Sequence, residues 1–267
     1  MDGTALITGA SSGIGKATAA ALVARGYRVL GTSRRPEALT AERRTDGVEY
    51  FPLDLGDEAS IEVLATTVGP VDVLVNNAGE SQCGPFEELP GAALRRLFQV
   101  NVLGPVRLSQ LLLPGMRERR RGTVVMVGSM LASFPLAYRS SYVASKAALK
   151  GFSDGARHEY SPFNVWLTTV EPGSISTGIS ERRTTYLSEG SPHRADFERM
   201  LAALDRNERT GIPAERVAAT IVKVIETPRP RAHYAVGSNA PIVFPMRRLL
   251  PTGLVEKATH RRHDLRR

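Results

Sequence analysis

Short apolar runs alternate with longer amphipathic stretches along most of the chain. The apolar runs are almost entirely aliphatic or β-branched, a composition typical of strands that are buried on both faces. Six of these runs lie at residues 4–9, 28–33, 48–55, 71–79, 122–129 and 165–173, and a seventh lies at 233–237. The pattern predicts a sheet of seven strands.

The stretches between the runs have the periodicity of amphipathic helices. Residues 15–26 and 57–69 fit this pattern, and Gly26 is placed to close the first helix. Strands that alternate with helices pair in parallel, with the helices packed on both sides of the sheet. The sequence therefore predicts an α/β fold with a doubly wound, mostly parallel sheet.

Residues 91–121 also have a helical pattern, but two prolines interrupt it. Pro105 and Pro114 lie inside the segment, and an interior proline normally kinks or breaks a helix. We expect a long, bent helix that carries Asn101 close to the irregularity.

A polar, turn-rich segment, residues 174–196, follows the sixth apolar run. A loop at the end of a strand is a common place for a lid over a ligand. No internal repeat or clear linker divides the chain. We therefore expect a single domain whose catalytic part spans residues 1–240, with a lid near 174–200, and whose C-terminal extension spans residues 241–267.

The composition favours a soluble protein of the cytoplasm. A chain of 267 residues with 42% hydrophobic content can form a core without disulfides or metals. Its one cysteine, Cys83, cannot form an intrachain disulfide and fits a reducing compartment. The first residues do not resemble a signal peptide, and no apolar run approaches the roughly 20 residues that span a bilayer.

The net charge is +8, and much of it lies at the end of the chain. Residues 247–267 hold seven Arg or Lys against two acids, so +5 of the +8 belongs to this tail. The tail has no aromatic side chains for base stacking, so nucleic acid is not an expected partner. A solvated end segment is the simpler interpretation, and weak contact with anionic lipid or with a partner is the alternative.

The strongest single motif is the segment TGASSGIG at residues 8–15, where the first strand runs into a helix. Glycine permits tight turns and close approach of the backbone to a ligand. Amide groups at the start of a helix attract phosphate. At the first strand–helix junction of an alternating chain, this arrangement predicts a dinucleotide site.

The spacing of these glycines, Gly-x-x-x-Gly-x-Gly, resembles the pattern of the short-chain dehydrogenase/reductase family. Further motifs of that family follow in the same order along nearly the whole chain. They are Asp54 with Leu55, NNAG at residues 76–79, Asn101, Ser129, Tyr142 with Lys146, and Pro172 with Gly173 and Thr177. The resemblance implies a Rossmann-type fold and an oxidoreductase that acts on CH–OH groups with a nicotinamide cofactor.

The resemblance also implies a set of cofactor-binding residues. In the family, the Asp-Leu pair contacts adenine, the NNAG motif borders the cofactor, and the segment after Pro172 contacts the nicotinamide. The expected residues are Gly9, Ser11, Ser12, Gly13, Ile14, Gly15, Arg34, Asp54, Leu55, Asn77, Ala78, Gly79, Tyr142, Lys146, Pro172, Gly173, Ile175 and Thr177.

The end of the second predicted strand favours NADP(H) over NAD(H). An acid at this point would bind the ribose 2′-hydroxyl and repel a 2′-phosphate. Ser33 occupies the acid position, and Arg34 and Arg35 follow it. A guanidinium group binds phosphate well through its planar fork of donors. We expect Arg34, which is nearest the strand, to be the phosphate ligand.

Tyr142 and Lys146 are the expected centre of catalysis. Reduction of a carbonyl needs a proton donor and further donors around the oxygen. Tyrosine has an ordinary pKa of about 10, which a nearby cation lowers, and positions four apart share one face of a helix. By resemblance, Lys146 also holds the nicotinamide ribose, Ser129 donates to the substrate carbonyl, and Asn101 holds a water that links Lys146 to solvent.

Other candidate residues receive plainer interpretations. We expect Ser145 to serve local packing, Tyr138 to line the pocket, Trp166 to lie in the core, and Cys83 to be a small apolar filler. His260 and His263 lack the further ligands of a metal site, so no metal is expected.

The substrate class is less closely defined. The apolar and then basic end of the chain is similar to that of family members that act on lipophilic alcohols and ketones, whereas a 3-oxoacyl thioester reductase is a rival. A non-catalytic NADP-sensing regulator or scaffold is the alternative outside enzymes. The family also implies a homodimer or homotetramer that uses the helices near 91–121 and 140–160.

Overall fold

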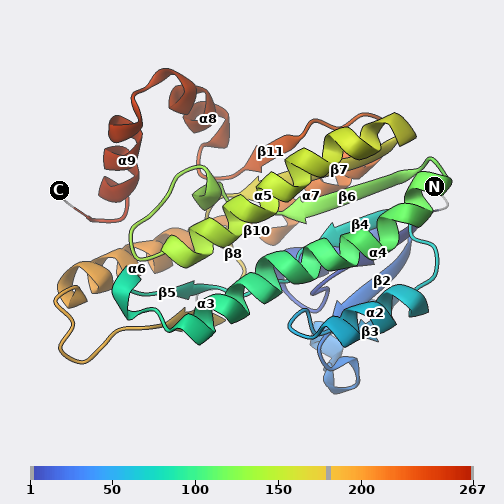
Figure 1. Cartoon of the computed structure of the whole chain (residues 1–267), viewed down its shortest axis with the longest axis horizontal. Helices are drawn as coiled ribbons and strands as arrows, with labels where there is room; N and C mark the ends of the chain where they lie inside the picture. The colour runs from blue at the N-terminus through green and yellow to red at the C-terminus, as the bar shows by residue number, and fades with distance from the viewer. Residues whose placement is uncertain (1–2, 179–181, 266–267) are drawn as a thin grey trace.

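The computed structural model describes residues 3–178 and 182–265. Its centre is a sheet of seven parallel strands in the order β3-β2-β1-β4-β6-β7-β11 (Figure 1). The strands are β1 (Thr4–Ile7), β2 (Arg28–Ser33), β3 (Val48–Pro52), β4 (Val73–Asn76), β6 (Gly122–Val127), β7 (Val165–Pro172) and β11 (His233–Val236). The order runs outward in both directions from β1 and β4, so the prediction of a doubly wound sheet is confirmed.

Helices cover both faces of this sheet. α1 (Gly13–Val23) and α7 (Ala214–Glu226) pack on one face, and α2 (Glu58–Thr67), α4 (Gly104–Glu118) and α5 (Ser140–Tyr160) pack on the other. Alternate residues of β1 supply the two cores: Leu6 belongs to one and Ile7 to the other, and neither is exposed. The near-continuous apolar strands are therefore explained by burial on both sides.

Six of the seven predicted strands extend beyond the observed ones at the carboxyl end. β3 ends at Pro52 although apolar residues continue, and Leu53 and Leu55 lie in the loop that follows. Both leucines are buried and line a cavity above the sheet edge. The apolar pattern therefore marks burial around a ligand site as well as strand structure.

The helical segment after α2 contains the irregularity that its prolines predict. α3 (Gly91–Phe98) passes into a π-helical turn at Gln99–Leu103, and α4 continues from it. Asn101 lies in the middle of this turn, and Pro105 lies in the first turn of α4. Pro105 has no backbone N–H to donate to the preceding turn, and the helix widens into the π-helical turn just before it. Pro114 does not end α4, which continues to Glu118.

The lid region is more ordered than its turn-rich sequence predicts. β8 (Ile175–Ser176) pairs with β10 (Ile212–Pro213), and β9 (Thr184–Thr185) pairs with β5 (Gln82–Cys83). Residues 194–200 of the expected lid form the first turns of α6 (Arg194–Arg209). Residues 179–181 of the predicted lid lie outside the described residues.

The C-terminal extension returns over one end of the molecule. α8 (Ala240–Leu249) and α9 (Thr252–Arg261) follow β11 and form a separate pair of helices (Figure 1). Beyond α9, Leu265 packs against α6, and Asp264 forms an ion pair with Arg206. Residues 264–265 are thus fixed to α6.

The shorter helical turns complete the description. They are η1 (Pro36–Ala38), η2 (Ala41–Arg43), η3 (Phe86–Glu88), η5 (Met130–Ala132) and η6 (Ser161–Phe163).

Two of the residue-level expectations are tested here. Cys83 has no exposed surface and packs in an apolar cluster with Phe197 and Met200, so its prediction as a filler is confirmed. Trp166 does not lie in the core. It is half-buried near the start of β7, with the guanidinium of Arg157 over its ring at 4.9 Å.

Candidate cofactor and active site

The glycine loop and the NNAG motif form one structure. The Thr8 hydroxyl accepts hydrogen bonds from the backbone amides of Asn77 and Ala78, each at 2.9 Å. The Asn77 side-chain amide donates to the Thr8 carbonyl oxygen, also at 2.9 Å. Two segments some 70 residues apart are therefore fixed together at the carboxyl edge of the sheet.

The three glycines of the loop are needed for different reasons. Gly9 and Gly13 have φ angles of +68° and +50°, a conformation that other residues rarely adopt. A Cβ atom at Gly15 would lie 2.3 Å from the Gly9 carbonyl oxygen. Gly15 thus allows α1 to begin directly against the loop, and the backbone amides of this junction remain open to a ligand.

A cavity of about 1190 Å³ lies above this edge. All of the predicted cofactor residues except Gly15 line it. Its volume exceeds the roughly 300–1,000 Å³ of an ordinary small-molecule site. The glycine loop, the volume of the cavity and the family positions that line it fit a dinucleotide together with a substrate.

Arginine side chains line the part of the cavity that follows β2. Arg34 and Arg35 are exposed there, and Arg43 of η2 joins them from a position that the sequence did not indicate. Among the described residues, no carboxylate forms an ion pair with any of the three. Three uncompensated cations favour an anionic ligand at this point.

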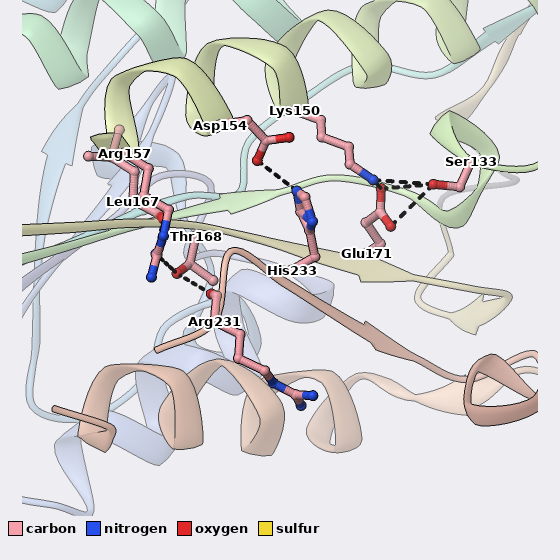
Figure 2. Close-up of polar contacts among 9 residues, drawn as sticks. All are labelled: Ser133, Lys150, Asp154, Arg157, Leu167, Thr168, Glu171, Arg231 and His233. Atoms are coloured by element: carbon pink, nitrogen blue, oxygen red, sulfur yellow. Dashed lines mark hydrogen bonds and ion pairs between the residues drawn. The ribbon is translucent and has the colours of Figure 1, made fainter. Parts of the chain in front are cut away.

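One face of α5 is held against the sheet by polar contacts (Figure 2). Lys150 forms an ion pair with the buried Glu171 of β7 at 3.0 Å, and Asp154 contacts His233 of β11 at 2.6 Å. Arg157 donates to the Leu167 carbonyl oxygen at 2.6 Å. These side chains recur every three or four residues, so they continue the face that carries Tyr142 and Lys146. They fix that face relative to the strand ends.

Tyr142 and Lys146 are both buried at the cavity wall, with 8% and 6% of their surfaces exposed. The Lys146 ammonium lies 5.9 Å from the centre of the Tyr142 ring and donates to the Val127 carbonyl oxygen at 2.9 Å. Burial lowers the pKa of Lys146 to about 8. The lysine is thus mostly charged at neutral pH and loses its proton as the pH rises past about 8.

Ser129 follows the end of β6. Its hydroxyl forms a side-chain hydrogen bond with the hydroxyl of Tyr142. Burial raises the pKa of Tyr142, whereas the cation of Arg139 and the hydrogen bond from Ser129 act to lower this pKa. The sequence prediction placed Ser129 and Tyr142 in one site, and the structure brings them into contact. A hydroxyl and a phenol at one point of the wall can both donate to an oxygen atom of a bound substrate.

Asn101 does not line the cavity. Its side-chain oxygen accepts from the Glu80 amide at 2.8 Å, and its nitrogen donates to the Glu80 carbonyl at 2.9 Å and to the Ser145 hydroxyl at 3.2 Å. The Ser145 hydroxyl is fully buried and donates to the Tyr142 carbonyl at 2.8 Å. Ser145 therefore serves local packing, as predicted. Asn101 supports the turn after Gly79, beside which the Lys146 ammonium lies.

The expectation for Tyr138 is wrong. Its ring packs edge-on against Phe197 at 5.8 Å and His193 at 6.0 Å, and it does not line the cavity. Its backbone has a φ angle of +64°, in the left-handed region. This turn occurs just before α5 and directs the side chain to α6 instead of the cavity.

Sequence reasoning missed several charged residues of the wall. Arg139, Arg182 and Glu208 line the cavity, and the buried Arg183 lies behind them. Arg183 pairs with Asp205 and Glu208 of α6, at 2.6 Å in each case. These pairs connect positions more than 20 residues apart. No local motif marks such pairs, so only the fold could reveal them.

The C-terminal segment contributes many apolar residues to the cavity wall, together with Arg247 and Arg262. The cavity-lining residues from α8, α9 and the short turn between them include Val243, Met246, Leu250, Leu254 and Val255. Leu131 and Phe134, which follow Ser129, line the same region. The cavity thus joins a glycine-rich, cationic part to an apolar part, with Tyr142 on its wall.

Within residues 3–178 and 182–265, no group of three or more His, Cys, Asp or Glu side chains is placed to hold a metal ion. None of the helices in these ranges combines the length and the apolar character that a bilayer crossing needs.

The comparisons with known proteins agree with this site. The pattern of the short chain dehydrogenase family matches residues 3–187. The chain therefore belongs to the short-chain dehydrogenase/reductase family, a family of oxidoreductases that bind a nicotinamide cofactor.

Two relatives resemble most of the chain. A 3-ketodihydrosphingosine reductase of Bacteroides thetaiotaomicron is 31% identical over 90% of this chain and 89% of its own. Retinol dehydrogenase 8 of Bos taurus is 30% identical over 94% of this chain and 86% of its own.

Two solved structures share the fold. A short-chain dehydrogenase from Streptomyces avermitilis has a TM-score of 0.82 and 37% identity, and the match covers 98% of this chain and 97% of that one. The closed form of a serine dehydrogenase complexed with NADP⁺ has a TM-score of 0.75 and 25% identity, over 89% and 95% of the two chains.

Proposed function

We propose that this protein interconverts a lipophilic ketone or aldehyde and the corresponding alcohol, with NADP(H) as cofactor and Tyr142 as the acid/base group. The observation that carries the proposal is the position of Tyr142. It is buried in the cavity wall, in contact with Ser129 and beside Lys146.

The cofactor, when bound, supplies or accepts the hydride. In the reductive direction, Tyr142 gives its proton to the oxygen of the substrate. Ser129 donates a hydrogen bond to the same oxygen and keeps it within reach of the phenol. Lys146 supplies a cation that favours the phenolate left behind, and it is also placed to hold the ribose. Asn101 fixes the turn beside Lys146. We also propose that it holds a water that links Lys146 to solvent.

Selection of NADP(H) rests on the cationic end of the cavity. Ser33 leaves the position of the discriminating acid without a negative charge, and Arg34 and Arg35 follow it. A 2′-phosphate would find guanidinium donors here and no carboxylate to repel it. The NADP⁺ complex of the serine dehydrogenase supports the same choice.

The lipophilic substrate is supported by the apolar wall that α8 and α9 provide. The names of the two relatives, a 3-ketodihydrosphingosine reductase and a retinol dehydrogenase, agree with this class. Because these helices and the sheet enclose one cavity, we also propose that residues 241–267 belong to the catalytic domain. The cytoplasmic location and the homo-oligomeric state stay predictions.

The decisive test is Tyr142→Phe, which removes the transferable proton and little else. Turnover of a panel of carbonyl compounds, followed by NADPH absorbance, should fall by about 10²–10⁴-fold, the range of a lost general acid. NADPH binding, followed by cofactor fluorescence, should change little. Tyr160→Phe at the far end of α5 is the matched control and should retain full turnover. Full activity in the Tyr142 variant would reject the mechanism, and wild-type binding without turnover of any carbonyl would favour a sensor.

A further inference from the structure

Arg139 is a buried cation next to the phenol of Tyr142. It immediately precedes α5, and only 3% of its surface is exposed. Its guanidinium carbon lies over the Tyr142 ring, 4.3 Å from the ring centre. Nothing in the family motifs marks this position, which lies three residues before the tyrosine.

The contacts of Arg139 fix its orientation without neutralising its charge. Nη1 donates to the Ser81 hydroxyl at 3.0 Å and to the Gln82 carbonyl at 3.2 Å, and both acceptors are neutral. Its Nε is buried and has no hydrogen-bond partner among the described residues. Arg183, the other buried arginine nearby, is paired with two carboxylates. The charge of Arg139 is therefore the one directed at the tyrosine.

Lys146 is a weaker source of positive charge at this point. Its ammonium is 5.9 Å from the ring centre, compared with 4.3 Å for the Arg139 guanidinium. Burial lowers the pKa of both groups, that of Lys146 to about 8. A guanidinium nevertheless stays protonated throughout the working range of proteins. Above pH 8, Arg139 is thus the cation that persists.

We propose that Arg139 is a second, permanent cation for Tyr142, a positioning residue that holds the ring and stabilises the phenolate formed during proton transfer. The proposal rests on the acid/base role of Tyr142. In the reductive direction, the O–H bond of Tyr142 breaks and a new O–H bond forms on the substrate oxygen. The negative charge left on the phenol then lies near the guanidinium, whose carbon is 4.3 Å from the ring centre, and a nearby opposite charge favours ionisation.

Other groups around Tyr142 modify this effect. Arg183 adds positive charge and Ser129 adds a hydrogen bond, and both act to lower the pKa of Tyr142. Glu208 of α6 acts to raise this pKa. Cys83 faces Arg139 from β5, but burial raises the pKa of its thiol and keeps it neutral near pH 7. After burial itself, Arg139 is the largest single influence on the tyrosine.

The test is a direct titration of the tyrosine in the full-length enzyme without cofactor. Tyrosine labelled with ¹³C at Cζ gives a resonance that shifts on ionisation, and Tyr142→Phe identifies the signal. Arg139→Met should raise the pKa of Tyr142 by about 1–3 units, the usual effect of an adjacent opposite charge. Arg139→Lys, which keeps the charge, should restore much of the difference. Arg231→Met removes another ring-stacked arginine, which lies over Tyr234 and is exposed, and should leave the Tyr142 signal unchanged.

The kinetic readout is the pH profile of kcat for carbonyl reduction. The limb assigned to Tyr142 should move with the NMR titration in Arg139→Met and return in Arg139→Lys. Circular dichroism checks that the variants are folded, and Arg139→Gln replaces the Met variant if that one is not.

An unshifted Tyr142 titration in Arg139→Met or Arg139→Gln would overturn the proposal. So would a change confined to KM, which would make Arg139 a substrate contact. Activity that survives Tyr142→Phe would instead reject the proposed function, whatever the titration shows.

Discussion

Lys146 occupies a position where burial opposes its charge. It lies in the cavity wall with one backbone carbonyl as its hydrogen-bond acceptor, and burial lowers its pKa from 10.5 to about 8. Under the proposed function, such a residue is kept for its chemistry at some cost in stability, which is common for functional sites.

We therefore expect Lys146→Met to stabilise the cofactor-free protein while it abolishes turnover. The unfolded chain keeps the lysine proton up to a pKa near 10.5, whereas the folded chain releases it at about 8. The penalty is thus complete below pH 8 and fades as the pH rises to 10.5. In urea unfolding, the variant should gain about 2–3 kcal/mol at pH 7 and progressively less above pH 8.

Lys150→Met is the matched control for this prediction. It removes a lysine one turn further along α5, but this one is paired with the buried Glu171. The loss of one partner leaves a buried charge alone, so the control should lose roughly 3 kcal/mol. A Lys146 variant that is less stable than the wild type at pH 7 would contradict the expected sign.

At the residue scale, motifs identified the residues that define the family and little else. Tyr142, Lys146 and Ser129 could be predicted because their spacing is fixed by the chemistry that they share. Arg139 could not, because a single arginine between Tyr138 and two serines has no distinctive pattern. Tyr138 was placed in the cavity wrongly, since its direction depends on a left-handed backbone angle that the sequence does not specify.

Under the proposed function, the element that selects the cofactor is the segment between β2 and β3. It holds Arg34, Arg35 and Arg43 at one end of the cavity, on two short helical turns and the residues before them. Because the three charges lie together, we expect the proposed preference for NADP(H) to depend on the segment as well as on Arg34.

We expect Arg34→Asp to weaken the use of NADPH and to improve that of NADH. An acid here would repel the 2′-phosphate and accept the 2′-hydroxyl of NADH. Since a hydrogen bond to a charged group contributes about 1.5–3 kcal/mol, kcat/KM for NADPH should fall by about 10–100-fold. Kinetics with both cofactors measure the change, and an unaltered NADPH preference would refute the assignment to Arg34.

Two comparisons make that measurement specific. Arg35→Asp shows how far the neighbouring arginine shares the task. Arg216→Asp on α7 changes the net charge by the same amount at an exposed position away from the cavity. It should therefore change kcat/KM for neither NADPH nor NADH.

Elements were easier to predict than their ends. The central strands were found because burial on both faces produces a recognisable apolar run, and the half-buried edge strands β3 and β11 kept enough apolar residues to be found as well. The predicted strands were too long at their carboxyl ends because the loops that follow them are also buried, beneath the cavity. Leu53 and Leu55 are examples. The two-residue strands β5, β8, β9 and β10 are too short to have any pattern, and their pairing depends on residues up to about 100 positions apart.

At the scale of the whole molecule, the site joins both ends of the chain. The glycine loop comes from the first 15 residues, Tyr142 from the middle, and the apolar wall from α8 and α9 near the C-terminus. The cofactor region follows family motifs residue by residue, whereas the C-terminal wall resembles that of some family members only in its general composition. Specificity for a substrate is therefore expected to depend on the part of the chain that was hardest to predict.

This division predicts that substitutions in the C-terminal wall affect long substrates selectively. Leu250 and Leu254 line the cavity, so Leu250→Gln with Leu254→Gln should weaken contact with an alkyl chain but leave the reacting carbonyl in place. The apolar contact of one such side chain contributes about 1.5–3 kcal/mol when it is fully buried. For a long-chain 2-alkanone, kcat/KM should fall by about 10–100-fold, and for a four-carbon ketone it should change little. Leu249→Gln alters an exposed leucine outside the cavity and serves as the control. Equal losses for short and long ketones would mean that these helices stabilise the fold and do not select the substrate.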